Sequence, residues 1–233
     1  MQDSPENRKL RILKAVVHEY LETAEPVSSG VLVTKYRLGV SPATVRNDMV
    51  ELTERGLLEQ PHTSAGRRPT EAGYRLYVRE FVDQSVKFME DLVRQVQAMT
   101  AELVHQQEAA ARNFARYMAE LTGETAFVSM NDSVFMTGVS NLFRKPEFRT
   151  PELMEDFSVM FDQIDDLVRD VRPRMQNDIV IYIGRENPFC PRLSSVLTRL
   201  DSGDGLIGII GPTRMDYEHN LGVMRSVHEA LAR

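Results

Sequence analysis

Side chains that can hydrogen-bond to nucleic-acid bases and phosphates gather in two short segments within residues 41–70. The first segment, SPATVRND, opens an expected helix and carries Ser41, Thr44, Arg46 and Asn47. An arginine can contact guanine through two hydrogen bonds, and an asparagine can do the same with adenine. Short hydroxyl side chains at the start of a helix can reach phosphates, because the free backbone N–H groups there attract anions. The segment is therefore typical of a helix whose first turns enter the major groove of DNA.

The second segment, PHTSAGRRPT, is a basic loop. Its hydrogen-bond donors and cations are His62, Thr63, Ser64, Arg67 and Arg68. A basic loop that lies along a duplex gains affinity, because neutralising phosphates releases counterions. Prolines at both ends stiffen the loop, and Gly66 is expected to give its tip backbone freedom. Two roles stay open for Arg68, which can contact a phosphate or pack its stem while its charge points to solvent.

The surrounding pattern places both segments in a winged helix-turn-helix. Apolar residues at helical spacing predict helices over about 7–23, 28–36 and 42–55, and short strands over 57–60 and 67–69 flank the basic loop. Ser41 followed by Pro42 marks a helix start, Gly56 suits a left-handed C-terminal cap, and Thr70 can cap a further helix.

The apolar residues of the third helix decide which of its side chains face outward. The inner stripe consists of Val45, Met49 and Leu52. This stripe turns Thr44, Arg46 and Asn47 to the outer face. Asp48 has two interpretations, because it would repel phosphate if it were exposed, or it can pair with an arginine.

The charge distribution favours a nucleic-acid partner for the first part of the chain only. The net charge is −6, but residues 1–80 carry +1 and residues 81–233 carry −7. Residues 61–79 contain four arginines and one glutamate. A basic patch on an acidic protein is typical of a DNA-binding module joined to a regulatory domain. The alternative is a chance surface cluster.

A helical pattern continues over residues 71–121. A 3–4 repeat of apolar residues indicates a candidate dimer helix through Leu92, Val96, Met99 and Leu103. The alternative is two consecutive helices that pack on their own domain. From residue 122 onward, strands are expected at 125–130, 178–184, 194–200 and 206–211, and helices at 151–171 and 216–232. We therefore expect an α+β protein with domains 1–80, 81–121 and 122–233.

Other kinds of site find little support in the sequence. The single cysteine, Cys190, excludes an internal disulfide and fits a cytoplasmic location. The five histidines lack metal-ligand spacing, and neither a cofactor motif nor a nucleophile–base pair is recognisable, so we expect no metal, no cofactor and no enzyme activity. The longest apolar run, GLIGIIG (205–211), is too short to span a membrane.

Three further features each have two interpretations. Cys190 is either a redox-sensing thiol or an incidental cysteine. The segment GIIGPTRMDY (208–217) is either an anion site with Arg214 or a structural corner. The acidic helix at 152–170 is either a solvated face or a partner surface.

Several motifs resemble the HrcA family, the heat-inducible transcription repressors of bacteria. They include SPATVRNDM (41–49), QPHTSAGRRPT (60–70) followed by GYRLYV (73–78), TGVSNLFRKPEF (137–148) and GIIGPTRMDYEHNLGVMRSVHEAL (208–231). The resemblance implies a winged-helix domain and a GAF-like domain interrupted by a dimerising insert. It also implies a homodimer that binds an inverted-repeat operator of double-stranded DNA upstream of chaperone operons, is modulated by a GroEL-type chaperonin and is inactivated by heat.

The chain departs from this family in two places. TAFVSM (125–130) is followed almost at once by NDSVFM (131–136), so the dimerising insert and part of the GAF-like domain are expected to be missing. Arg68 stands where the family usually has an aliphatic residue. The alternative function is a winged-helix protein-interaction module without specific DNA binding.

Overall fold

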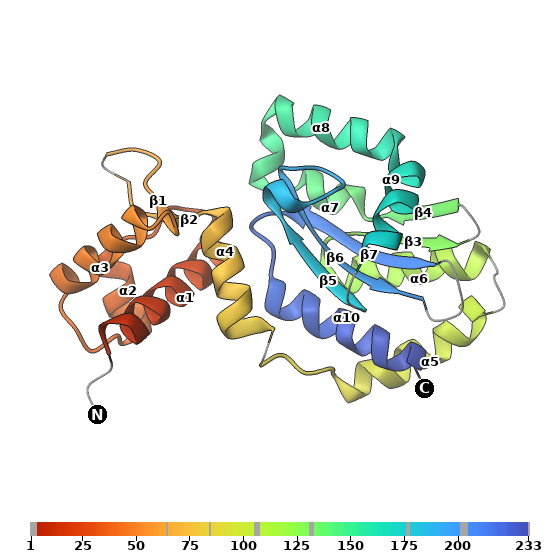
Figure 1. The fold of residues 1–233 in the computed structure, drawn as a ribbon, viewed down its shortest axis with the longest axis horizontal. Coiled ribbons are helices and arrows are strands. Elements are labelled where there is room, and N and C mark those ends of the chain that lie inside the picture. The colour runs from red at the N-terminus through yellow and green to blue at the C-terminus, as the bar shows by residue number, and fades with distance from the viewer. Residues whose placement is uncertain are drawn as a thin grey trace. The chain divides into compact units, whose positions relative to one another are not determined.

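The chain folds into two compact units, Met1–Ser85 and Val86–Arg233 (Figure 1). The structure is a computed structural model that describes residues 4–63, 65–83, 85–104, 108–130, 133–175, 178–200 and 205–232. Within the described residues, no helix is long and apolar enough to cross a membrane.

The N-terminal unit is a winged helix-turn-helix, which confirms the expected fold. Its elements are α1 (Pro5–Thr23), α2 (Ser29–Tyr36), α3 (Pro42–Glu54), β1 (Leu58–Glu59), β2 (Arg68–Pro69), α4 (Glu71–Tyr77) and η1 (Val78–Val82). The strands β1 and β2 pair antiparallel. The predicted caps are present, because the hydroxyl of Ser41 accepts from Thr44 N and that of Thr70 from Gly73 N, both at 3.1 Å. Gly56 follows α3 with a φ of 70°.

Ion pairs between α1 and α3 hold the third helix in its orientation. Asp48 is 3% exposed and accepts two hydrogen bonds from Arg8, at 2.6 Å from Nε and 2.9 Å from Nη2. One turn further along α3, Glu51 lies 2.5 Å from Lys9 of α1. Of the two interpretations of Asp48, the structure shows the arginine pair, so this carboxylate does not face a ligand.

The helical stretch 71–121 is divided between the two units. After η1, residues 86–89 are not helical, and α5 (Glu90–Val104) and α6 (Glu108–Thr122) follow. The hydroxyl of Tyr117 on α6 donates to Gln95 Oε1 on α5 at 2.9 Å. A continuous helix would separate these residues by about 33 Å, at about 1.5 Å per residue. The chain therefore turns back between α5 and α6, and the two helices pack against each other.

The residues of the candidate dimer helix lie in this second unit. Val96 is fully buried and Leu92 is 6% exposed, while Met99 is half-buried. The side chain of Leu103 lies outside the described residues. Because α5 packs on α10 (Tyr217–Ala232), Leu92 and Val96 are already covered within one copy of the chain.

The C-terminal unit is built on one antiparallel sheet, as expected for a reduced GAF-like α+β domain. The strands are β3 (Thr125–Met130), β4 (Ser133–Thr137), β5 (Ile179–Ile183), β6 (Leu193–Arg199) and β7 (Leu206–Pro212), in the order β4-β3-β7-β6-β5. The sequence did not predict β4. Two residues separate β3 from β4, at the place where the family's insert is expected to be missing, and the described sheet is continuous.

Helices cover both faces of this sheet (Figure 1). On one face α6 contacts β3 and β4, and α10 contacts β6 and β5. On the other face lie α7 (Val139–Phe143), η2 (Pro146–Arg149), α8 (Pro151–Asp162), α9 (Ile164–Val171) and the short turn η3 (Arg172–Arg174), with η4 (Gly184–Glu186) after β5. Cys190 belongs to the core beneath α8 and α9 and is 2% exposed. Burial raises the pKa of its thiol, which favours a packing role over redox sensing.

The corner GIIGPTRMDY is held by an ion pair and a helix cap. Arg214 donates to both carboxylate oxygens of Glu147, at 2.6 and 3.2 Å, and is 12% exposed at its side chain. Asp216 caps α10 by accepting from His219 N at 3.0 Å. These contacts favour the structural interpretation of the corner over an anion site.

A second buried pair lies beside this corner. Glu124 is 2% exposed, and one of its oxygens lies 2.5 Å from Lys145 Nζ. Its other oxygen, Oε2, is buried without a hydrogen-bond partner among the described atoms. Burial raises the pKa of Glu124 to about 7, although Lys145 acts in the opposite direction.

This raised pKa predicts a specific pH dependence of stability. Because the folded protein favours the protonated carboxyl, the free energy of unfolding falls by up to about 3 kcal/mol as pH rises from the ordinary carboxyl range to above neutrality. We expect Glu124→Gln to remove this part of the slope in urea unfolding at about pH 5 and about pH 8. The exposed control Glu155→Gln should keep the wild-type slope. Equal slopes for wild type and Glu124→Gln would contradict the assignment.

Candidate nucleic-acid interface

The outer face of α3 presents the predicted polar residues to solvent. Val45, Met49 and Leu52 are at most 1% exposed and form the predicted inner stripe. Ser41, Arg46 and Asn47 are exposed. Thr44 is half-buried, and its hydroxyl lies 3.0 Å from that of Ser41. These two hydroxyls therefore support the helix start, while Arg46 and Asn47 are exposed and can reach a groove.

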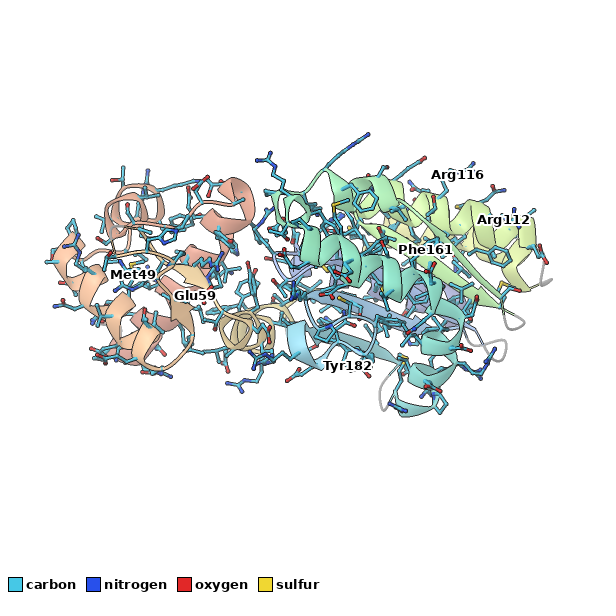
Figure 2. The ribbon with its side chains drawn as sticks, turned by 90° about the horizontal axis from the view of Figure 1, so that it is seen from above. Met49, Glu59, Arg112, Arg116, Phe161 and Tyr182 are labelled. Carbon is cyan, nitrogen blue, oxygen red and sulfur yellow. The ribbon has the colours of Figure 1, made fainter. Side chains whose placement is uncertain are left out.

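A hollow of about 420 Å³ brings α3 together with the start of α2 and the wing, which consists of β1, β2 and the loop between them (residues 58–69). Arg46 of α3, Thr63 of the loop and Arg67 of the wing line it. In the described part of the chain, Arg46 has no ion-pair or hydrogen-bond partner. In Figure 2, the label Met49 marks α3, which lines this hollow, and the label Glu59 marks β1, the strand directly before the lining residue Gln60. Two guanidinium groups 21 positions apart in sequence thus share one concave surface, which suits a phosphate backbone.

The two arginines of the wing lie on opposite faces of its ribbon, because successive strand residues alternate. Arg67 Nε donates to the Thr53 hydroxyl at the end of α3 at 2.8 Å. Arg68 Nε instead donates to Glu59 on the paired strand at 2.6 Å, and its side chain also interacts with Tyr20 of α1. Arg67 is therefore on the side of the hollow, and the charge of Arg68 is directed toward a carboxylate.

The wing is fixed by contacts that the sequence did not reveal. Val27, between α1 and α2, exchanges two backbone hydrogen bonds with Arg67, at 2.8 and 2.9 Å. Gln60 Nε2 donates to the carbonyl oxygens of Thr63 and Ala65, at 3.0 and 2.9 Å. The tip residues His62 and Thr63 are exposed as predicted, and Ser64 lies outside the described residues.

Gly66 has a different role from the one expected. The backbone of Gly66 does not adopt a positive φ. A Cβ atom at this position would lie 2.4 Å from the carbonyl carbon and oxygen of Val27. The position therefore requires glycine because two backbone segments approach closely, and not because of a positive φ.

Sequence reasoning also missed residues that line the hollow. Val50 is 37% exposed and lies one turn after Arg46, where it can contact a thymine methyl group. The spacing of four from Arg46 is a signal that could have identified it. Ser28, Ser29 and Gln60 line the same hollow, but only the fold brings them there.

Comparisons with known proteins agree with both units. The family model of the DeoR-like helix-turn-helix domain matches residues 18–68, and that of the HrcA protein C-terminal domain matches residues 78–220. The chain belongs to the HrcA family. Its winged helix is thus joined to a C-terminal domain that is characteristic of this family.

HrcA relatives align with nearly the whole chain. The heat-inducible transcription repressor HrcA of Moorella thermoacetica is 26% identical over 334 aligned positions that cover 98% of this chain and 97% of the relative. The protein of the same name from Pelotomaculum thermopropionicum is 60% identical over 73 residues, which cover 31% of this chain and 21% of the relative. Because 334 positions exceed the 233 residues of this chain, the Moorella protein contains residues that this HrcA-family chain lacks.

A solved structure shares the fold of this HrcA-family chain. The crystal structure of a hypothetical protein at 2.2 Å resolution superposes with a TM-score of 0.73 and 18% identity, and covers 97% of this chain and 96% of that chain.

The close approach at Gly66 predicts a local effect on stability. Gly66→Ala should force the wing away from Val27 and lower the free energy of unfolding by about 1–3 kcal/mol. Gly30→Ala on α2 is a matched control, because its Cβ would meet only Ser28 Oγ at an ordinary 3.8 Å. Urea unfolding checks both variants. An equal effect of the two substitutions would contradict the role of the close approach.

The opposite faces of Arg67 and Arg68 predict different salt dependences of DNA binding. Arg67→Ala should weaken binding to every duplex and reduce the salt slope by about one, because one phosphate contact is lost. Arg68→Ala should leave that slope nearly unchanged, because Glu59 already neutralises this guanidinium. Fluorescence anisotropy over a range of salt concentrations measures both slopes. A larger change for Arg68→Ala would reverse the assignment of the two faces.

Proposed function

We propose that this protein is a heat-inducible transcription repressor that reads an operator with α3 and holds the DNA backbone with the wing. The observation that carries the proposal is the shared hollow, which Arg46 of α3 and Arg67 of the wing line together with the start of α2. Support comes from its membership of a family whose named relatives are heat-inducible transcription repressors.

The base-reading roles in this proposal fall to Arg46 and Asn47. Both side chains are exposed within two turns of the helix start, where a recognition helix is closest to the bases. His62, Thr63 and Arg67 contact the backbone, and Ser64 is assigned with them from the sequence. Ser41 and Thr44 hold the helix start and orient its free N–H groups toward phosphate.

The proposed DNA complex contains two copies of the chain on an inverted repeat. Two-fold symmetry of an operator mirrors two-fold symmetry of the protein. Since Leu92 and Val96 are buried within one copy, the two copies meet through another surface. Heat would release the DNA by destabilising the native fold, and a GroEL-type chaperonin would act on that folding equilibrium. Light scattering of the free and DNA-bound protein measures the number of copies.

The proposal predicts that Arg46 carries sequence preference. Wild type should bind a chaperone-promoter fragment with an inverted repeat more tightly than a scrambled duplex of the same length. Arg46→Ala should lose about 1–3 kcal/mol of this preference, while binding to the scrambled duplex changes less. Arg37→Ala is a matched control, because Arg37 is also exposed but lies in the turn before α3.

The rival function is a winged helix that binds a protein and not DNA. It predicts no salt-dependent binding to any duplex. Binding of equal strength to both duplexes by wild type, or an unchanged preference in Arg46→Ala, would exclude the base-reading role.

A further inference from the structure

A groove of about 300 Å³ runs between α6 and β4 in the C-terminal unit. Arg112 and Arg116, on successive turns of α6, form one wall (Figure 2). Phe135 and Thr137 of β4 contribute the other wall. This groove belongs to the acidic part of the chain, since residues 81–233 carry a net charge of −7. Two neighbouring cations on this otherwise acidic unit favour an anionic partner at the groove.

The two arginines are available to a ligand. The guanidinium of Arg112 lies 5.2 Å from the centre of the Phe135 ring, so a cation–π contact holds it over the groove. Its ion pair with Glu108 is long, at 3.7 Å, and both side chains are largely exposed, which makes this pair easy to exchange. Arg116 is exposed and has no ion-pair or hydrogen-bond partner among the described residues.

The wall that β4 contributes is also the edge of the sheet. β4 is the outermost strand and pairs only with β3 in the described sheet. The N–H of Val134 donates to Asp165 Oδ1 at 3.0 Å, which shows that the backbone groups of Val134 point away from β3. Because the pattern repeats every second residue in an antiparallel strand, those of Met136 point outward as well. The edge can therefore pair with an extended segment beyond the position that Asp165 occupies.

We infer that this groove binds an extended acidic segment of a partner protein. The segment adds to β4 as a further strand, with hydrogen bonds to the outward backbone groups of Met136. Its carboxylates, at every second position, face Arg112 and Arg116, and the chain passes beside Phe135. A second copy of this chain fits poorly, because the strand SVFMT (133–137) has no acidic residue and a two-fold pairing of β4 edges would bring α6 beside α6. This surface is separate from the proposed DNA site, so each can fail independently.

The test is fluorescence anisotropy with a short labelled peptide of alternating glutamate and valine, at low and high salt. Wild type should bind this peptide, and the same peptide with lysine in place of glutamate should not bind. Arg112→Ala and Arg116→Ala should each weaken binding about tenfold. Arg169→Ala is the matched control, because Arg169 is an exposed arginine that is ion-paired with Asp166 on α9, and α9 covers the face of the sheet opposite α6.

Three results would overturn the inference. The first is equal binding of the glutamate peptide to wild type and to the Arg112→Ala, Arg116→Ala double variant. The second is equal binding of the lysine peptide. The third is self-association that the double variant abolishes, without any peptide binding, because it would assign the groove to a second copy. Both arginines are exposed, so unchanged thermal unfolding of the variants separates lost binding from lost folding.

Discussion

The bidentate ion pair between Arg8 and Asp48 is the contact on which the DNA-reading surface depends. It fixes one carboxylate of α3 inside the N-terminal unit, with two hydrogen bonds from α1. A buried charge that loses its partner costs about 3–5 kcal/mol, so α3 cannot rotate about its axis to expose this carboxylate. Because Arg46 and Asn47 immediately precede it in a helix, holding Asp48 inward holds them outward. This fixed orientation of α3 also directs Arg46 into the hollow beside the wing.

The boundaries of the N-terminal unit could be predicted because their signals are local. A serine before a proline starts α3, a glycine with positive φ ends it, and Thr70 caps α4. Each residue acts through hydrogen bonds or backbone angles within a few positions of itself. The outer face of α3 followed from the same logic, since three buried apolar residues fix which side of a helix is solvated.

The features that escaped prediction depend on residues far apart in sequence. The sequence around residue 86 contains no glycine or proline, yet η1 ends at Val82 and residues 86–89 are not helical. The backbone N–H of Met89 instead donates to the hydroxyl of Ser226, 137 positions away, and Val86 lies beside Gly222. The wing shows the same limit, because the need for Gly66 comes from Val27 and the pairing of Arg68 comes from the strand register with Glu59.

The central claim is that α3 and the wing form one surface that contacts DNA. It is tested most directly by amide chemical-shift changes when the labelled protein is titrated with an inverted-repeat duplex. We expect the largest changes at residues 41–50 and 60–67, together with Ser28 and Ser29 at the start of α2. Changes confined to the C-terminal unit, or to only one of the two segments, would contradict it.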